Sequence, residues 1–320
     1  MKIVLTILLN NILPIFLLVA LGILYGRKFS PDMNTLTKIN LYMLVPIFTF
    51  VYLYTSYIPM DMLKVLAFAV IMMVVGFTLA FVVSGMMKFD QGKRYAFINS
   101  IIFYNSGNIG VPLITLVFSS APFITGGKTP YLELALTSQI MILVIQNIAT
   151  NSIGFFNAGR AKMDWRQSLK NILRVPTIYV VPLAFLLKLV PLDLTRLPLW
   201  PALDYMRNAL VAVALLTLGA QISRTKLTSV SKGVILSSFM RLICGPAIAF
   251  AIIRLLALEG IIAQAVMISS AVPTAVNTAL IAVEYDNHPG FASQSVLLST
   301  LLCTLTLPGV IYAARILFPV

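Results

Sequence analysis

Charged residues are scarce in this sequence, because Asp, Glu, Lys and Arg together make up only 10% of the 320 residues. Soluble domains carry about 25%. With 59% of the residues hydrophobic, too little polar surface remains to cover a body in contact with water. The composition therefore indicates an all-α polytopic membrane protein. It excludes soluble enzymes, nucleic-acid readers and secreted modules built on disulfides.

Histidine and cysteine are also rare, which limits the chemistry open to the chain. The single histidine, His288, cannot form a His-rich metal site. Cys244 and Cys303 both lie in apolar runs, where structural thiols are commoner than disulfides or metal ligands. No span holds a helical pair of aspartates, a Ser–His pair or a Gly-x-x-x-x-Gly-Lys-Ser/Thr phosphate loop. We therefore expect no enzymatic activity, no metal and no cofactor.

The few charges are mostly basic, with 23 Lys and Arg against 10 Asp and Glu and a net charge of +13. In membrane proteins such residues gather in cytoplasmic loops, so we expect no nucleic-acid partner. The loops after the first, third, fifth and seventh predicted spans hold Arg27, Lys28, Lys88, Lys93, Arg94, Arg160, Lys162, Arg166, Lys170, Arg174, Arg224, Lys226 and Lys232. This predicts a plasma (inner) membrane protein with both termini extracytoplasmic, although the acidic loop Glu284–Gly290 departs from the pattern.

Apolar runs of the length needed to cross a bilayer recur along the chain. A spanning helix needs about 20 mostly apolar residues, and this window predicts ten transmembrane helices. They are Ile3–Tyr25, Leu36–Thr55, Met62–Met87, Tyr95–Ser119, Tyr131–Phe155, Pro176–Val190, Ala202–Ile222, Gly233–Leu258, Ile261–Tyr285 and Ala292–Leu317. A cytoplasmic loop, 158–175, separates a first group of five, 1–157, from a second, 176–320.

The two groups of five predicted spans are weakly similar to each other. Pro112 interrupts the predicted fourth span and Pro273 the predicted ninth, at equivalent depth in their groups. Because each group has an odd number of spans, the second repeat must be inverted relative to the first. Paired spans interrupted by Gly or Pro at matching positions point to a transporter site near the midplane.

The fourth span contains the first of these interrupted segments. It reads Asn105-Ser-Gly-Asn-Ile-Gly-Val-Pro112-Leu113. Proline removes a backbone donor, and glycine adopts conformations that other residues resist. We expect an unwound crossover at 107–112. A half-helix from Pro112 would then present free N–H groups and the positive end of its dipole to an anion.

The ninth span offers the same ingredients around Pro273, namely small residues and an asparagine. A simple proline kink explains either segment alone equally well, but asparagines in both favour a binding site. Two broken helices that cross would bring their polar groups to one cavity. The predicted substrate-binding residues are Asn105, Asn108, Gly110, Val111, Pro112, Gln139, Arg241, Pro273, Thr274, Asn277 and Thr278.

Two other polar residues within the predicted spans have more than one possible role. Arg241 either attracts a carboxylate substrate, pairs with helix-end carbonyls, or is a structural residue that extends its guanidinium towards the cytoplasmic interface. Gln139 on the fifth span could reach the crossover, whereas Gln146, Asn147 and Asn151 are expected to hold helices together.

Several short motifs, taken in their order along the chain, resemble those of a known family. These are the fourth-span segment, then Arg241-Leu-Ile-Cys-Gly-Pro246, then Pro273 with Ala282-Val-Glu-Tyr-Asp-Asn-His-Pro289, and finally Thr300 with Leu307-Pro308. The sequence resembles the auxin efflux carrier family, which includes plant PIN-formed exporters and bacterial permeases. That family falls in the bile acid–arsenite–riboflavin transporter superfamily.

The resemblance implies ten helices in two inverted five-helix repeats, with helices 4 and 9 crossed at the substrate site. Spans one, two, six and seven would form a scaffold that dimerises, and the others a transport domain. The implied function is export or uptake of small organic anions by an elevator-like movement. Plant members carry an acidic residue in the third span, which this chain lacks, so proton coupling through it is not expected.

The leading hypothesis is therefore a secondary transporter of a small organic anion such as a carboxylate. Its coupling ion could be H⁺ or Na⁺, and hydroxyls such as those of Ser106, Ser270 or Thr274 could help to bind Na⁺. The alternatives are a transporter-like ligand sensor and a passive anion channel. Flux of a labelled carboxylate would separate a transporter from a sensor, and saturable flux with counterflow would exclude a channel.

Overall fold

A computed structural model describes residues 6–159, 170, 173–224 and 230–320. Throughout this part of the chain the secondary structure is helical, and it contains no β-strand longer than an isolated bridge. The longer helices are α2 (Leu13–Phe29), α4 (Val45–Thr55), α5 (Asp61–Met86), α6 (Gln91–Ile102), α8 (Leu132–Ala149), α11 (Thr177–Lys188), α12 (Trp200–Ser223), α14 (Gly245–Leu255), α15 (Gly260–Ser270) and α17 (Pro289–Leu317). The shorter ones are α3 (Met33–Ile39), α7 (Val111–Phe118), α9 (Phe155–Ala158), α13 (Lys232–Phe239) and α16 (Val276–Glu284).

Seven helices of the described part are long and apolar enough to cross a membrane, which supports a multi-pass protein. They are Leu8–Phe29, Met33–Thr55, Asp61–Met86, Leu132–Ala158, Trp200–Ser223, Lys232–Leu255 and Pro289–Leu317. The predicted fourth, sixth and ninth spans correspond to shorter apolar helices, Ser106–Phe118, Thr177–Lys188 and Gly260–Ser270. Most of the predicted loop 158–175, with Arg160, Lys162 and Arg166, lies outside the described residues, as does Lys226.

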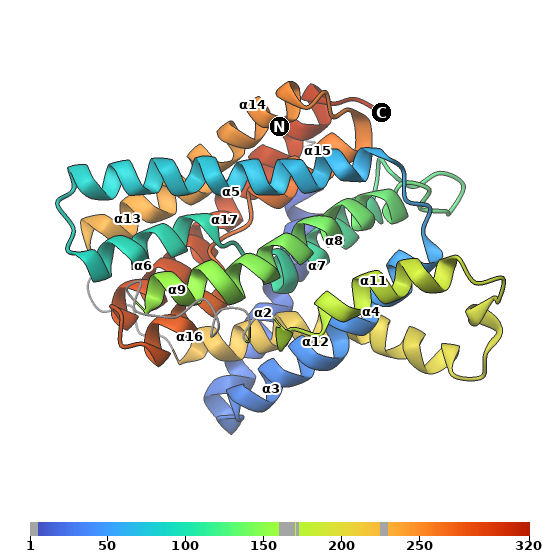
Figure 1. Cartoon of the computed structure of the whole chain (residues 1–320), viewed down its shortest axis with the longest axis horizontal. Helices are drawn as coiled ribbons and strands as arrows, with labels where there is room; N and C mark the ends of the chain where they lie inside the picture. The colour runs from blue at the N-terminus through green and yellow to red at the C-terminus, as the bar shows by residue number, and fades with distance from the viewer. Residues whose placement is uncertain (1–5, 160–169, 171–172, 225–229) are drawn as a thin grey trace.

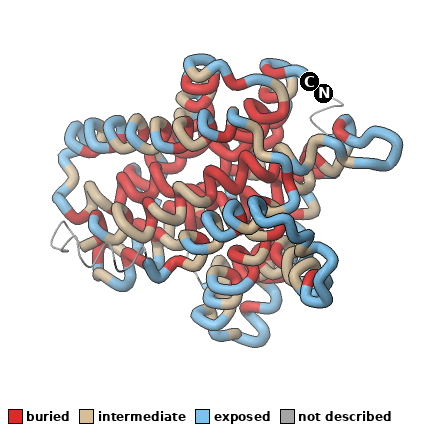
Figure 2. The backbone as a smooth tube through the Cα atoms, turned by 45° about the vertical axis from the view of Figure 1, so that its right-hand side comes forward, coloured by how far each residue is buried: buried red, intermediate tan, exposed pale blue. Residues whose placement is uncertain are grey.

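Two groups of helices can be followed in Figure 1. Helices α3, α4, α11 and α12 gather in the lower part of the view, whereas α5, α13, α14 and α15 lie in the upper part. Buried residues concentrate between the helices, and exposed residues line the outer edges (Figure 2). Many of those exposed residues are large and apolar, such as Leu17 and Leu24 on α2, as expected for helices that face lipid.

Several prolines lie inside continuous helices because a wider turn precedes each of them. A five-residue π-helical segment ends two residues before the proline in four places. The segments are η1 (Leu8–Ile12), η2 (Asn40–Leu44), η3 (Ser106–Gly110) and η6 (Met240–Cys244), which precede Pro14, Pro46, Pro112 and Pro246. In η3 the Val111 N–H donates to the Ser106 carbonyl. Longer i to i+5 bonds of this kind make room for a proline that has no N–H of its own.

The predicted interruption at Pro112 is therefore wrong in position. The fourth predicted span breaks at 103–105, between α6 and η3, and the helix then runs unbroken from Ser106 to Phe118. The ninth span breaks at 271–275, between α15 and α16, where Pro273 was predicted to interrupt it. The partner of the Pro273 segment is thus the stretch around Tyr104, not the one around Pro112.

The two breaks form a crossover, defined here as segments 103–105 and 271–275. Their extended backbones pair in antiparallel fashion, with the isolated bridge between Tyr104 and Thr274. The Asn105 N–H donates to the Pro273 carbonyl at 2.8 Å, and the Ala275 N–H donates to the Phe103 carbonyl at 3.0 Å. Backbone groups that two helices leave unpaired are thereby satisfied inside the protein, as membrane depth demands.

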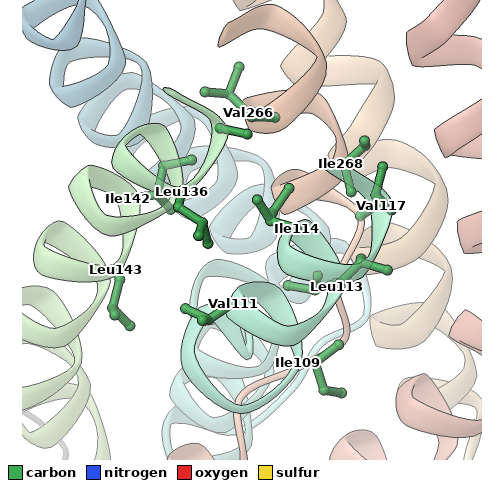
Figure 3. Packing of buried hydrophobic residues seen from close by; sticks show 14 of the residues in the cluster. Ile109, Val111, Leu113, Ile114, Val117, Leu136, Ile142, Leu143, Val266 and Ile268 are labelled. Carbon is green, nitrogen blue, oxygen red and sulfur yellow. The ribbon is translucent and has the colours of Figure 1, made fainter. Parts of the chain in front are cut away.

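The hydrophobic core holds the second half of the broken fourth span in place. Val111, Leu113 and Ile114 of α7 are fully buried, and they lie among side chains of α8 and α15 in Figure 3. Val111 therefore fills the core and does not present its side chain to a ligand. This packing fixes the helix whose first turn begins at the crossover.

Close contact between α2 and α12 depends on small residues. A Cβ atom added to Gly219 of α12 would collide with the Val19 carbonyl oxygen and lie 2.8 Å from the Gly22 Cα atom. Gly26 likewise has the backbone of Ala220 against it. Small residues at such positions let helix backbones approach closely within a membrane.

Substitution of Gly219 by alanine is expected to force these two helices apart. Because the colliding atoms are backbone, they cannot move aside, and overpacking of this kind costs about 1–3 kcal/mol of unfolding free energy. Thermal unfolding in detergent should show a clear fall in the midpoint. The control is Gly309→Ala on α17, where an added Cβ has open space within 4 Å. Equal midpoints for both variants would contradict the proposed close packing.

Candidate functional site

A polar cavity lies on one side of the crossover, with about 670 Å³ of space free of protein atoms, part of it open to solvent. All of its lining residues in the described part are uncharged. They are Thr37, Asn40, Leu41, Val45, Tyr104, Asn105, Ser106, Gly107, Asn108, Leu143, Gln146, Asn147, Thr150, Thr217, Gln221, Ala275, Val276 and Asn277.

The cavity has two walls that come from different groups of helices. One wall, called the crossover wall, is formed by the crossover and the adjoining turns 104–108 and 275–277, together with α8. The other, called the scaffold wall, is formed by 37–45 of α3, η2 and α4, and by Thr217 and Gln221 of α12. A ligand in this cavity would contact both groups of helices at once.

Asn105 is the best-oriented polar side chain of the crossover wall. Its Oδ1 accepts a hydrogen bond from the Asn108 N–H at 3.1 Å and so caps the helix that begins at Ser106. Because a backbone N–H can only donate, this bond fixes which amide atom is oxygen. The Asn105 side chain is 5% exposed, and its Nδ2 has no partner in the described part. A buried donor without a partner thus belongs to a residue that lines the cavity.

Two helices begin at the crossover wall. The helix Ser106–Phe118 starts after Asn105, and α16 starts at Val276 after the second break. The first N–H groups of any helix lack intrahelical partners, and each N-terminus is equivalent to about half a positive elementary charge. Both starting turns line the cavity. Such an arrangement can bind an anion without a basic side chain.

The opposite ends of the broken helices meet at Arg241. Its Nη1 donates to the Ile101 carbonyl at 2.8 Å, its Nη2 donates to the Ser270 carbonyl, and its guanidinium lies 4.6 Å from the centre of the Tyr104 ring. Ile101 and Ser270 lie in the last turns of α6 and α15. Cations are favoured at helix C-termini because the dipole is negative there. Of the alternatives for Arg241, the structure therefore shows pairing with helix-end carbonyls.

Two glutamines of α8 support the broken fourth span. The Gln146 Nε2 donates to the Ile102 carbonyl and its Oε1 accepts from the Tyr104 N–H, both at 3.2 Å. The Gln139 Nε2 donates to the Ser106 carbonyl at 2.7 Å. Gln146 thus holds both sides of the break, while Gln139 holds the first turn of the next helix. This explains why the helix breaks at 103–105.

The scaffold wall presents two side-chain amides. The Asn40 Nδ2 donates to the Thr217 hydroxyl at 3.1 Å, and the Gln221 Nε2 donates to the Thr37 hydroxyl at 3.2 Å. The amide oxygens of both residues are buried without a hydrogen-bond partner in the described part. The scaffold wall therefore offers acceptors, in contrast to the donors of the crossover wall.

Comparison with known proteins places this chain in a family. A family model described as a membrane transport protein matches residues 7–311, nearly the whole chain. The chain belongs to this family. The match confirms the resemblance to the auxin efflux carriers that the motifs predicted. A protein of Methanothermobacter thermautotrophicus, described as an uncharacterized transporter, is 23% identical over 307 residues, which cover 93% of this chain and 96% of that protein.

In this membrane transport protein, the structure brings only part of the predicted site together. Asn105, Asn108 and Asn277 line one cavity. The remaining predicted residues do not line it: Gly110, Val111, Pro112, Gln139, Arg241, Pro273, Thr274 and Thr278. Three of them pack behind the cavity, since a Cβ on Gly110 would collide with the Gln139 amide and the Thr274 hydroxyl donates to the Ser100 carbonyl at 2.7 Å.

Sequence reasoning missed most of the scaffold wall of the membrane transport protein. Asn40, Thr217 and Gln221 are polar residues within otherwise apolar helices, and that signal alone could have found them. Gln146 and Asn147 were expected only to hold helices together, yet both line the cavity. The two cysteines are free thiols, as predicted.

Proposed function

We propose that this membrane transport protein is a secondary carrier of small organic anions and that it binds the anionic group at the crossover wall. The observation that carries the proposal is the meeting of two helix N-termini with the unpartnered, buried Asn105 Nδ2 in one cavity. Half-helix N-termini that point at anionic groups near the midplane are a recurring transporter arrangement. The absence of charged lining residues in the described part leaves these amides as the natural anion ligands.

The proposed architecture has ten spans in two inverted five-helix repeats. The antiparallel pairing of segments 103–105 and 271–275 supports this arrangement, because the two broken helices must then approach the crossover from opposite directions. Spans one, two, six and seven would form a scaffold that also makes a homodimer, and the remaining spans a transport domain. The cavity between two walls suits an elevator-like movement of one against the other.

The proposed topology places the cavity on the cytoplasmic side of the crossover. Thr37 and Gln221 of the scaffold wall lie close in sequence to Arg27, Lys28 and Arg224. The positive-inside rule assigns those basic loops to the cytoplasm of a plasma (inner) membrane, with both termini outside. In this state the carrier would exchange its substrate with the cytoplasm.

Asn105→Ala is expected to abolish saturable uptake of labelled carboxylates by purified protein in liposomes. The substitution removes the free Nδ2 donor and also the cap of the second half-helix, so both contributions to anion binding are lost. Helix caps of this kind are worth about 0.5–2 kcal/mol. Asn277→Ala at the start of α16 is expected to act in the same direction.

The matched control is Asn151→Ala. Asn151 follows α8, does not line the cavity, and its Nδ2 donates to the Asn147 carbonyl of the preceding turn. Its substitution should leave uptake unchanged. Normal uptake by both Asn105→Ala and Asn277→Ala would refute the site. A wild-type protein that binds carboxylates but moves none would indicate a sensor, and unsaturable flux without counterflow would indicate a channel.

A further inference from the structure

We infer that the substrate carries one negative charge and a neutral hydrogen-bond donor such as a hydroxyl group. The inference rests on the proposed function and specifies the chemical class of its substrate. It follows from the charges of the four half-helix ends at the crossover and from the polar groups of the facing wall.

Four helix ends meet at the crossover, and they separate by sign. Helices α6 and α15 end on the side of Arg241, while Ser106–Phe118 and α16 begin on the side of the cavity. Each helix end is equivalent to about half an elementary charge. The Arg241 side therefore carries about one negative charge from the two C-termini, and the cavity side about one positive charge from the two N-termini.

Arg241 compensates the negative charge of the two helix C-termini. Its guanidinium supplies one positive charge, directed at the carbonyls of both C-terminal ends. It is 2% exposed, and none of the ion pairs in the described part involves it. The two C-termini and Arg241 thus compensate one another. At the two N-termini, by contrast, no charged residue of the described part lines the cavity, although the neutral Asn105 side chain caps the first of them.

A ligand with a single negative charge completes this balance. All lining residues of the cavity in the described part are uncharged, so a second carboxylate or an ammonium group would be held without a partner of opposite sign. An unpaired ion removed from water is strongly disfavoured. The site is therefore expected to reject dicarboxylates and zwitterions in favour of monocarboxylates.

The scaffold wall adds the requirement for a donor. The free amide oxygens of Asn40 and Gln221 lie on the wall that faces Asn105, and their nitrogens are engaged by the hydroxyls of Thr217 and Thr37. An apolar substituent against them would leave both oxygens unpaired, which is costly in a buried site. A hydroxyl group on the substrate would satisfy one of them.

Competition in proteoliposomes tests both parts of the inference. Labelled lactate is the probe, with propionate, malate and alanine as competitors. Propionate lacks the hydroxyl, malate adds a carboxylate, and alanine replaces the hydroxyl with an ammonium group. Each is expected to compete at least about tenfold more weakly than unlabelled lactate, the effect of one unpaired buried polar group. Asn105→Ala should abolish the saturable uptake of labelled lactate itself, as the proposed function requires.

Two substitutions of Gln221 test the substrate's hydrogen-bond donor and its single negative charge separately. Gln221→Leu should reduce the advantage of lactate over propionate, because it removes one of the two free amide oxygens. Gln221→Lys should raise the potency of malate relative to lactate, because the added ammonium pairs with the second carboxylate. If malate competes as strongly as lactate in the wild type, the single-charge inference is overturned. If propionate competes as strongly as lactate, the requirement for a donor is overturned. Either result leaves the carrier function standing. No saturable uptake of any probe would overturn the carrier function as well.

Discussion

Arg241→Met is expected to lower the stability of the protein and to abolish transport. The substitution removes two hydrogen bonds to helix-end carbonyls and the contact with the Tyr104 ring. Buried carbonyls that lose their partner cost about 1–3 kcal/mol each, and a desolvated cation–π contact is worth about 2 kcal/mol.

One effect opposes this loss, since exchange of a buried charge for an apolar group can itself be stabilising. In that situation both members of an ion pair are replaced, whereas here the carbonyls of Ile101 and Ser270 stay behind. We therefore expect a net loss on the order of 3 kcal/mol in the free energy of unfolding, measured as a lower thermal midpoint in detergent.

The control for Arg241→Met is Arg254→Met. Arg254 is exposed and lies 5.3 Å from the ring centres of both Phe250 and Phe318, so the substitution removes cation–π contacts but leaves no helix-end carbonyls behind. Its midpoint should change little. Arg241→Lys should fall between wild type and Arg241→Met, because it keeps the charge but loses the planar fork. A Met variant as stable as the wild type would contradict the role assigned to Arg241.

Gln146→Leu is expected to produce the second large effect, a loss of about 2–6 kcal/mol in unfolding free energy. Gln146 is 3% exposed and satisfies the Ile102 carbonyl and the Tyr104 N–H on the two sides of the break. Leucine has nearly the same size but leaves both backbone groups without a partner. Because the crossover wall is then no longer fixed, anion uptake should fall together with the thermal midpoint.

Gln264→Leu provides the matched control for this prediction. Gln264 is equally buried and makes one hydrogen bond, to the Phe318 carbonyl at 2.7 Å, and it does not line the cavity. Its loss should lower stability by about half as much and leave the selectivity among carboxylates unchanged. If the two glutamine variants were indistinguishable in stability and in uptake, Gln146 would have no special part in the break.

The positions of the apolar helices follow from the sequence because a bilayer imposes a simple length rule on them. The break at Pro273 was also predicted from the sequence, where this proline lies among small residues. In the structure no π-helical turn precedes Pro273, so the helix does break there. The break in the fourth span does not follow from Pro112. A π-helical turn accommodates that proline, and the hydrogen bonds that open the helix at Tyr104 come from Gln146, 42 residues away in the chain.

The site residues next to the crossover could be predicted from the sequence. Those of the scaffold wall could not. Asn105, Asn108 and Asn277 stand out beside the breaks. Asn40 and Gln221 are separated from them by long stretches of sequence, and only packing brings them to the same cavity. Arg241 was open to several interpretations because charge alone does not tell which side of the crossover a guanidinium occupies.

The two backbone hydrogen bonds between Phe103–Asn105 and Pro273–Ala275 also bear on how the protein is made. A ribosome completes the first of these two segments well before it reaches the second. The nascent chain therefore passes through a stage in which polar main-chain groups sit inside the bilayer without the neighbours they will later have. Water, lipid headgroups or an insertion factor must shelter them until the rest of the polypeptide arrives.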